Sequence, residues 1–280
     1  MVNVEIKNLV VDFETLQQDS DDTVKRRAID DVSLDINEGD FICILGKNGS
    51  GKSTLAKCLN ALVTPSSGHV KIYGLDTSEE NNINEIRKKV GISFQNPDNQ
   101  IVASIVEEDV AFGLENIGIP TEEMQKRIDY SLKALGILDL KNKLTHKLSG
   151  GQKQKVSIAG IIAMESKIII LDEPTSMIDK KGRIDLLNTV KKLNVENNIT
   201  IILISHFVEE IAYANRVLVM SDGKILYDKP PKEILLMKDE LYNVGLELPY
   251  IPKLATELKS CGLKLNGNED TIEELCQFLK

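Results

Sequence analysis

Short, almost wholly apolar runs recur along the chain and are separated by stretches in which apolar residues return every three or four positions. Three such runs occupy residues 41–45, 168–171 and 200–204. A short apolar run bounded by glycine or polar residues is typical of a strand that is buried on both faces. Alternation of these strands with helical periodicity predicts an α/β fold with a largely parallel central sheet.

Two other segments have a clear periodicity. Residues 32–36 alternate between apolar and polar side chains, which predicts a strand with one solvated face. Over residues 121–135 the apolar residues lie at helical spacing and Gly136 follows, which predicts a helix with Thr121 as its N-cap. We interpret this region as a helical insertion between strands of the sheet.

The remaining segments are connections and ends. A polar loop is predicted over residues 17–25, and the pair Pro230-Pro231 is predicted to close the last strand-and-helix unit. Residues 241–280 then form a short mixed tail. We find no internal repeat and no low-complexity segment.

Composition narrows the classes of function. Apolar residues make up 42% and charged residues 28% of the 280, as in soluble globular proteins, and a net charge of −9 argues against nucleic-acid binding through a basic face. The N-terminus lacks a signal-peptide core, and no apolar run approaches the ~20 residues of a membrane helix, so a membrane role is expected through a partner. The cysteines show no C-x-x-C pairing and are expected to be buried free thiols: Cys43, Cys58, Cys261 and Cys276.

The segment after the first apolar run matches the pattern G-x-x-x-x-G-K-[ST]. Its glycines let the backbone curl so that N–H groups point at phosphate oxygens, and a helix beginning near Lys52 adds its positive dipole end. We expect Lys52 to reach the β and γ phosphates and Ser53 to ligate Mg²⁺. The residues expected to bind ATP are Gly46, Lys47, Asn48, Gly49, Ser50, Gly51, Lys52, Ser53 and Thr54.

The second apolar run delivers two adjacent carboxylates, Asp172 and Glu173, at its C-terminal end. Doubly wound sheets bind ligands at this end of their strands. Asp172 is expected to hold Mg²⁺, and Glu173 is expected to polarise the attacking water as a catalytic residue. Such a pair alone usually caps a helix. The neighbouring segment 46–54, called the phosphate loop from here on, favours the catalytic interpretation.

A second anion-binding helix start is predicted where Leu148 is followed by Ser149, Gly150, Gly151 and Gln152. A serine and two glycines ahead of a helix over residues 152–164 would form another nest of N–H donors. An ordinary helix N-cap is the alternative interpretation of Ser149. Two phosphate-binding helix starts separated by a helical insertion cannot easily serve one nucleotide within one chain.

Together these motifs resemble the ABC-type ATPase cassette over residues 4–228. The phosphate loop is similar to its Walker A loop, the strand ending in Asp172 and Glu173 to Walker B, and residues 148–152 to its LSGGQ signature. The resemblance implies a P-loop NTPase fold with a RecA-like core, a helical subdomain and a short C-terminal extension. The implied bounds are 1–240 for the cassette, about 96–165 for the helical subdomain, and 241–280 for the extension.

The resemblance also implies roles for single residues. Gln95 fits the Q-loop, which senses the γ-phosphate and Mg²⁺ and touches the membrane partner, and His206 fits the switch histidine. The implied catalytic residues are therefore Glu173, His206 and Gln95, with Ser53, Gln95 and Asp172 at Mg²⁺. In this family the signature of one subunit completes the ATP site of the other, so two ATP molecules lie between two subunits. The residues implied to bind ATP in trans are Ser149, Gly150, Gly151, Gln152 and, in the D-loop, Asp179.

Finer details are similar to the ATPase subunits of energy-coupling-factor importers, which take up vitamins and cobalt or nickel. These details lie at residues 94–100, 158–161, 175–179 and 245–249. The segment 175–179 resembles the first of the two paralogous ATPases that pair in such importers. The implied function is coupling of ATP-driven dimer closure to substrate uptake at the cytoplasmic face of the cell membrane. The implied partners are a second ATPase subunit (a paralogue or a second copy), a transmembrane coupling subunit and a substrate-binding membrane subunit, with the extension in the dimer contact.

Two departures from the family pattern affect the expected contacts. Thr15 stands where an adenine-stacking aromatic residue is usual, so Phe13 or a residue of the 16–27 loop is left to fill that role. Lys155 stands after the signature where arginine is frequent, and it lacks the bidentate fork of arginine.

An acidic cluster follows Gln95, formed by Asp98, Glu107, Glu108 and Asp109. It fits either a rim that receives arginines of a coupling helix or a solvated helix start favoured by the dipole.

Other functions fit less well. An ATPase of a different ABC importer, for amino acids or metal chelates, and a non-transport ABC ATPase stay open. A regulatory GTPase needs N-K-x-D, and the Asn142-Lys143 pair lacks the aspartate. A chromosome or repair ATPase would carry a coiled coil between Lys52 and Ser149, where no heptads occur. Neither the transported substrate nor a choice between homodimer and heterodimer follows from the sequence.

Overall fold

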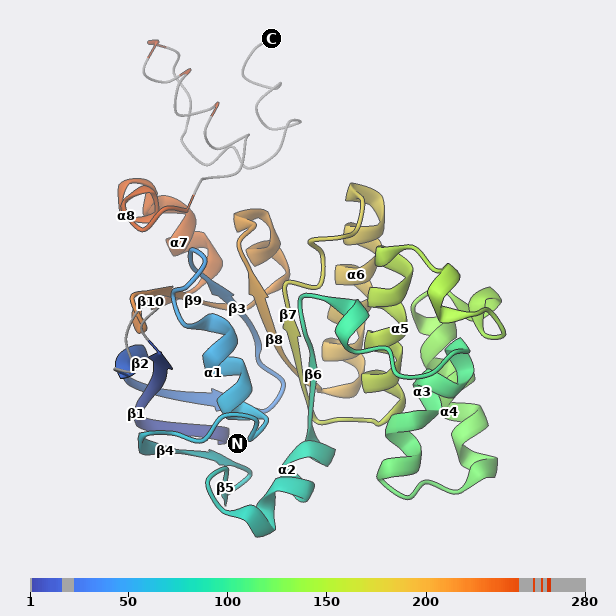
Figure 1. Ribbon diagram of the computed structural model, residues 1–280. Coiled ribbons are helices and arrows are strands. Elements are labelled where there is room, and N and C mark those ends of the chain that lie inside the picture. Colours follow the sequence, from blue (N-terminus) through green and yellow to red (C-terminus); the bar gives the residue numbers. More distant parts are fainter. Residues whose placement is uncertain (1, 17–22, 247–253, 255–257, 259–260, 263–280) are drawn as a thin grey trace.

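A computed structural model describes residues 2–16, 23–246, 254, 258, 261 and 262. Figure 1 shows its strands and helices. The strands are β1 (Val2–Leu16), β2 (Thr23–Asn37), β3 (Phe41–Leu45), β4 (Ser67–Ile72), β5 (Leu75–Asp76), β6 (Val90–Ser93), β7 (Ile168–Asp172), β8 (Thr200–Ser205), β9 (Arg216–Ser221) and β10 (Lys224–Lys229). The α-helices are α1 (Lys52–Leu59), α2 (Ile83–Lys89), α3 (Val106–Asn116), α4 (Thr121–Ala134), α5 (Gly150–Ala163), α6 (Lys180–Asn197), α7 (Pro231–Leu236) and α8 (Lys238–Asn243).

The central sheet contains six strands in the order β10-β9-β3-β8-β7-β6. All its pairings are parallel except that of β9 with the edge strand β10. The three apolar runs of the sequence form β3, β7 and β8 at its centre, which confirms the predicted α/β class and largely parallel sheet. Because parallel strands end at the same edge, the residues that follow β3, β7 and β8 meet there.

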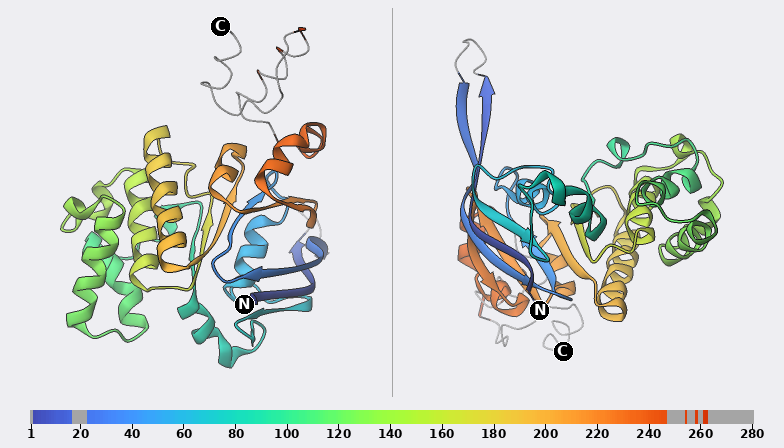
Figure 2. Two further views of the ribbon diagram at one scale, coloured as in Figure 1. Left: turned by 180° about the vertical axis from the view of Figure 1, so that it is seen from behind. Right: turned by 90° about the horizontal axis from the view of Figure 1, so that it is seen from below.

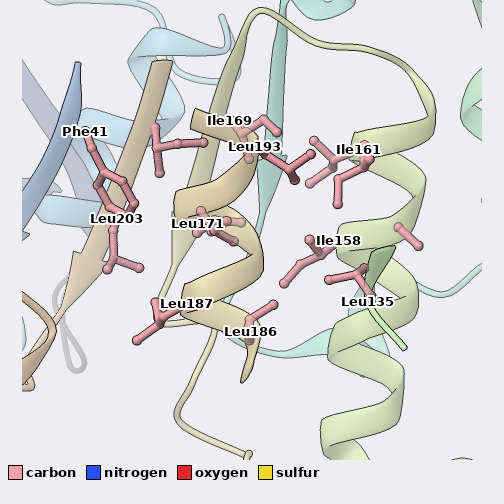
Figure 3. Packing of buried hydrophobic residues seen from close by; sticks show 14 of the residues in the cluster. Phe41, Leu135, Ile158, Ile161, Ile169, Leu171, Leu186, Leu187, Leu193 and Leu203 are labelled. Atoms are coloured by element: carbon pink, nitrogen blue, oxygen red, sulfur yellow. The ribbon is translucent and has the colours of Figure 1, made fainter. Parts of the chain in front are cut away.

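Each central strand is buried on both faces, because α5 and α6 cover one side and α1 with strands β1, β2 and β4 covers the other. In β3 the side chains of Phe41, Cys43 and Leu45 enter one core and those of Ile42 and Ile44 enter the other. Figure 3 shows the first core, in which side chains of β3, β7 and β8 pack against α6 and α5. Two-sided burial explains why these strands read as continuous apolar runs rather than as an alternation.

A second sheet is antiparallel and has the order β2-β1-β4-β5. Residues 32–36 lie in β2 with alternating burial, as their pattern predicts. The ends of the predicted 17–25 loop differ from expectation, because residues 23–25 already belong to β2 and pair with β1. Figure 2 shows the paired strands extending beyond the body of the molecule as a two-stranded ribbon. Residues 17–22 lie outside the described part.

The helical insertion contains α3, α4 and α5, and three of its expected boundaries need correction. Pro120 is the N-cap of α4 and Thr121 is its first residue, without a side-chain cap bond. Proline fits this place because its fixed φ suits an extended residue before the first turn. Gly136 follows the end of α4 with φ 67°, which confirms the predicted stop. The helix predicted over 152–164 begins earlier, at Gly150, and ends at Ala163.

The C-terminal elements also differ from expectation. Pro230 is the N-cap of α7 and Pro231 its first residue, so the pair begins a helix instead of closing the last unit. The start of the predicted 241–280 extension packs into the main core through Leu241 and Leu246. Most of that extension lies outside the described residues.

The cysteines follow the prediction in part. Cys43 and Cys58 are buried free thiols, but Cys261 is exposed. Cys276 lies outside the described residues. In the described ranges no helix is long and apolar enough to cross a membrane.

Candidate functional site

The phosphate loop connects β3 with α1 at the edge where the central strands end. Gly49 and Gly51 have φ of 83° and 102°, values that favour glycine. The buried Lys52 turns back into the loop, and its Nζ donates to the carbonyl oxygens of Gly46 at 2.7 Å and Lys47 at 3.0 Å. An ammonium group is thereby held within the curl of backbone N–H groups.

Two further hydroxyls belong to this loop. The Ser50 hydroxyl is buried and has no hydrogen-bond partner among the described residues. Ser53, in the first turn of α1, forms a side-chain hydrogen bond with Asp172 at the end of β7. A Cβ atom added at Gly46 would lie 2.5 Å from Ser50 Oγ, so this hydroxyl packs against the loop itself. The Lys52 ammonium is the group that favours an anionic ligand in the loop.

Burial shifts the two ionisable groups nearest the loop in opposite senses. Desolvation lowers the pKa of the Lys52 ammonium, although the charges of Glu173 and Asp172 raise it. Desolvation raises the pKa of Asp172, with the Ser53 hydrogen bond lowering it and the Glu173 charge raising it. Both shifts have the same cause: burial disfavours the charged form of a lysine and of an aspartate alike.

Two side chains from separate segments converge on one carboxylate oxygen of Glu173. Glu173 directly follows β7, is buried, and has φ 50°, a left-handed backbone that is strained for glutamate. Its Oε2 accepts a hydrogen bond from Gln95 Nε2 at 2.7 Å and lies 3.4 Å from His206 Nδ1. Gln95 follows β6 and His206 follows β8, so the parallel strands bring these predicted residues together.

Gln95 and Glu173 line a cleft of about 670 Å³ together with residues of the phosphate loop, and His206 is not part of its lining. Phe13 and Arg26, paired in register on β1 and β2, also line the cleft, and a Cβ atom added at Gly49 would lie 3.7 Å from an Arg26 guanidinium nitrogen. The Phe13 ring is 41% exposed. Thr15, the residue at the expected adenine position, has a side chain outside the described part. The other lining residues are Arg27, Ala28, Asn48, Gly49, Gly51, Lys52, Ser53, Thr54, Gln95, Glu173, Asp222 and Gly223.

Of these, Ala28, Asp222 and Gly223 are not indicated by the sequence, and Arg26 and Arg27 are indicated only as members of the 16–27 loop. Arg26 falls in the ribbon of β1 and β2, and the residue pair that follows β9 joins the cleft only through the antiparallel edge of the sheet. A single-sequence pattern contains no signal for such contacts across strands.

The predicted second anion site is a separate hollow of about 490 Å³. Ser149 caps α5, and its side chain and that of Gln152 form a reciprocal capping box. Asp179 caps α6 by accepting from Gly182 N at 3.2 Å. The residues that line the hollow include Ser149, Gly150, Gly151, Gln152, Lys155, Met177, Ile178 and Asp179.

The two hollows share no lining residue. Figure 1 shows α1, which begins in the phosphate loop, and α5, which begins in the signature, on separate parts of the molecule with β7 and β8 between them. One nucleotide bound to the phosphate loop of a chain therefore does not reach the signature of that chain.

The predicted acidic cluster is largely satisfied within the chain. Asp98 pairs with Lys153 at 2.5 Å, and Glu107 lies 3.6 Å from Lys141. Asp109 Oδ1 accepts from two backbone N–H groups, of Val102 at 2.7 Å and of Ala103 at 3.0 Å. Only Glu107 and Glu108 of the four face the hollow of about 570 Å³ between α3 and α4, which also contains Ile105, Phe112, Glu115 and Met124.

Lys155, which stands where arginine is frequent, makes a single long contact to Leu135 O at 3.4 Å. This is the weakened, single-donor contact expected for a lysine at that position.

Comparison with known proteins gives a consistent result. The family described as ABC transporter matches residues 29–176. The chain is 51% identical over 249 residues to the energy-coupling factor transporter ATP-binding protein EcfA1 of Caldanaerobacter subterraneus subsp. tengcongensis, covering 89% of this chain and 90% of that protein. It is 47% identical to the EcfA1 protein of Clostridium novyi over 99% of this chain and 97% of that protein.

A solved structure is similar over most of the chain. The structure of cbiO1 from Clostridium perfringens, described as part of the ABC transporter complex cbiONQ, has a TM-score of 0.75 and 35% identity. The similarity covers 92% of this chain and 99% of that one.

Proposed function

Because the chain belongs to the ABC transporter family, and within it to the energy-coupling factor transporter ATP-binding proteins, we propose that it drives substrate uptake by an importer of that kind. The family resemblance and the fold, an ABC ATPase cassette of the P-loop class, are confirmed by the comparisons, and the chain is an ATPase. The observation that carries the proposal is the meeting of Gln95, Glu173 and His206 beside the phosphate loop.

Nucleotide binding is proposed to use the whole phosphate loop. The predicted ATP ligands, residues 46–54, would supply backbone N–H groups and the Lys52 charge. The base would lie toward Phe13 and Arg26, which line the cleft. An aromatic face and a guanidinium plane both stack on a purine, so this pair is proposed to make the adenine contact that Thr15 leaves open.

The residues around Ser53 and Asp172 fit Mg²⁺. A hydroxyl and a carboxylate are the hard oxygen donors that this ion prefers, and Gln95 adds an amide oxygen. In the described ranges no group of three or more His, Cys, Asp or Glu side chains forms a metal site. A site completed by phosphate oxygens and water suits that donor set, because Mg²⁺ is usually bound through one or two carboxylates. When bound, Mg²⁺ would neutralise charge on the β and γ phosphates.

Hydrolysis is proposed to begin with a water held by Glu173. The Glu173 carboxylate accepts a hydrogen bond from this water and orients its oxygen toward the γ-phosphorus. The bond between phosphorus and the bridging β–γ oxygen breaks as the new bond to the water oxygen forms, and the proton that the water loses passes to the Glu173 carboxylate, leaving ADP and inorganic phosphate. His206 and Gln95 fix the carboxylate and lie where they can also donate to the γ-phosphate.

The second half of each ATP site is proposed to come from a second subunit. Ser149, Gly150, Gly151, Gln152 and Asp179 line a hollow away from the phosphate loop of their own chain. A face-to-face dimer would place each such hollow on the nucleotide of the partner, so that two ATP molecules close the dimer and hydrolysis reopens it. The proposed units are the cassette (1–240), with its helical subdomain at about 96–165, and an extension (241–280) in dimer contact.

The proposed assembly lies at the cytoplasmic face of the cell membrane. Its partners are a second ATPase subunit, a transmembrane coupling subunit and a small substrate-binding membrane subunit, with a vitamin or a transition-metal ion as cargo. The hollow between α3 and α4 suits a coupling helix because apolar Phe112 and Met124 lie beside Glu107 and Glu108. Arginines on such a helix would meet these acids.

Affinity capture of the tagged chain from detergent-solubilised membranes tests this function. We expect two kinds of membrane protein and a paralogous ATPase to co-purify, and the complex to hydrolyse ATP. Capture with permease subunits and an extracytoplasmic binding protein would instead indicate another class of ABC importer. Absence of any membrane protein from an active ATPase would indicate a non-transport role and contradict the proposal.

A further inference from the structure

A buried carboxylate, that of Glu210, lies next to the site but has no part in the mechanism above. Glu210 belongs to a short 3-10 helix (Val208–Tyr213) that follows β8, and it is 2% exposed. Its Oε1 accepts a hydrogen bond from Thr175 Oγ1 at 2.6 Å, and Ser205 forms a second side-chain hydrogen bond with it. Thr175 and Ser205 are buried as well.

The two hydroxyls belong to the segments that carry the catalytic pair. Thr175 lies two residues after Glu173, and Ser205 lies immediately before His206. One carboxylate therefore joins the chain just beyond Glu173 to the chain just before His206. The distance between the Glu173 Oε2 and His206 Nδ1 atoms, 3.4 Å, depends on how these two segments are held.

A third segment reaches the same carboxylate. Arg183 of α6 has its Nε 4.0 Å from Glu210 Oε1, and its guanidinium carbon lies 3.8 Å from the centre of the Phe207 ring. The N-cap of that helix, Asp179, lines the signature hollow. Within the described chain, Arg183 Nε and Glu210 Oε2 have no hydrogen-bond partner. A shift of about 1 Å would bring the pair to the length of a charge-assisted hydrogen bond.

A buried acid of this kind requires an explanation because burial disfavours its charge. Desolvation raises the pKa of Glu210, while the hydroxyls of Thr175 and Ser205 and the charge of Arg183 lower it. An apolar side chain would fill the same space without that cost. The acid is therefore retained for the contacts that it makes.

We propose that Glu210 is a positioning residue that sets the spacing of Glu173 and His206 and links it to the D-loop at the start of α6. The inference rests on the proposed function, because the D-loop is there assigned to the partner's nucleotide. Docking of the partner against Asp179 would move Arg183 toward Glu210, and the carboxylate would transmit this movement to the segments beside Thr175 and Ser205. The catalytic pair of each chain is thus tied to the state of its own D-loop.

The test measures steady-state ATP hydrolysis by the purified transporter complex, with kcat expressed per nucleotide-binding site counted by titration with a fluorescent ATP analogue. For Glu210→Ala we expect kcat to fall about a hundredfold, the cost of misplacing catalytic groups by about 1 Å, with KM for ATP within about twofold of wild type. Glu210→Gln keeps an acceptor for Thr175 and should retain more activity than Glu210→Ala. Glu209→Gln, a change at the exposed neighbour, should match wild type.

A double-mutant cycle separates positioning from stability. Thr175→Val should lower kcat less than Glu210→Ala does, and the combined variant should be no slower than Glu210→Ala, since both changes remove one connection. Equal kcat per binding site in wild type and Glu210→Ala would overturn the inference, even with a lower melting temperature. If Glu210→Ala does not fold, kcat per binding site of Glu210→Gln and of Thr175→Val is compared with wild type instead. Equal values in all three proteins would then overturn the inference. A wild-type complex that binds ATP without hydrolysing it would instead contradict the proposed function.

Discussion

At the scale of single residues, burial sets the chemistry of the acid at the end of β7. Asp172 is 5% exposed, and burial raises its pKa above the ordinary aspartate range. The folded chain therefore holds a proton at this group more tightly than the unfolded chain does. For such a group, stability is fully present below the unfolded pKa and is lost as the pH rises through the folded pKa.

Asp172→Asn should accordingly stabilise the nucleotide-free protein at pH 7, where wild type must bury a charge. The gain in the free energy of unfolding should shrink as the pH falls toward the unfolded pKa of about 4, because wild type then takes up its proton. Urea denaturation at several pH values measures this, with Asp185→Asn on the exposed face of α6 as the control. A destabilised Asp172→Asn protein at pH 7 would contradict this account. The same variant should lose Mg²⁺-dependent ATP binding, a trade of function for stability.

At the scale of elements, the helical insertion is joined to the central sheet by a close contact between β6 and α5. A Cβ atom added at Gly91 would lie 2.3 Å from Ile161 Cγ2, so no larger residue fits there without movement. This contact couples the strand that precedes Gln95 to the helix that begins at the signature. Gln154 of α5, almost wholly buried, adds a hydrogen bond to Ser93 Oγ at 2.9 Å.

Gly91→Ala should therefore lower the free energy of unfolding by about 1–3 kcal/mol, the usual cost of overpacking a core. Gly160→Ala is the matched control, because Gly160 lies in α5 with open space where its Cβ would be. That change should raise the free energy of unfolding by about 0.5–1 kcal/mol through helix propensity. Equal denaturation midpoints of the two variants would show that the β6–α5 contact does not constrain the fold.

The elements also show how far the sequence could predict the structure. The central strands were evident because burial on both faces leaves an unbroken apolar run. The ribbon of β1 and β2 was not, because residues 17–25 are polar and pairing across strands leaves no local signal. The site followed the same division: residues within motifs, such as Lys52 and Glu173, were recognisable, whereas Arg26 reaches the cleft only through strand pairing. The role of Glu210 was likewise not evident from the sequence. Acids in a short helix after a strand are common, and only tertiary contacts bring this one to Thr175 and Ser205.

At the scale of the whole molecule, the separation of the two anion-binding helix starts is the feature that requires a second subunit. The phosphate-loop cleft and the signature hollow have no lining residue in common. In the proposed dimer, each chain offers two half-sites that face different nucleotides. Hydrolysis should depend on both halves, but binding of ATP to one chain should depend only on the phosphate loop.

Ser149→Arg tests that division of labour. The bulky cation would fill the nest at the start of α5, and ATP hydrolysis by the assembled complex should fall at least ~100-fold, as when a preorganised donor set is removed. Affinity of the isolated chain for ATP should stay within about twofold of wild type. Glu122→Arg, in the first turn of α4 and away from the hollow, is the control. Loss of ATP affinity in the isolated Ser149→Arg chain would show that the signature acts on its own phosphate loop.

The most direct measurement is the mass of the Glu173→Gln protein in solution with and without Mg·ATP, determined by size-exclusion chromatography with light scattering. This variant keeps the phosphate loop but lacks the carboxylate that orients the water, so bound ATP should persist. We predict that Mg·ATP converts monomers into dimers, either of this chain alone or with its paralogous ATPase, with two nucleotides per dimer. Protein that binds ATP but stays monomeric, both alone and when mixed with the paralogous ATPase, would contradict the account of a nucleotide bound between two subunits.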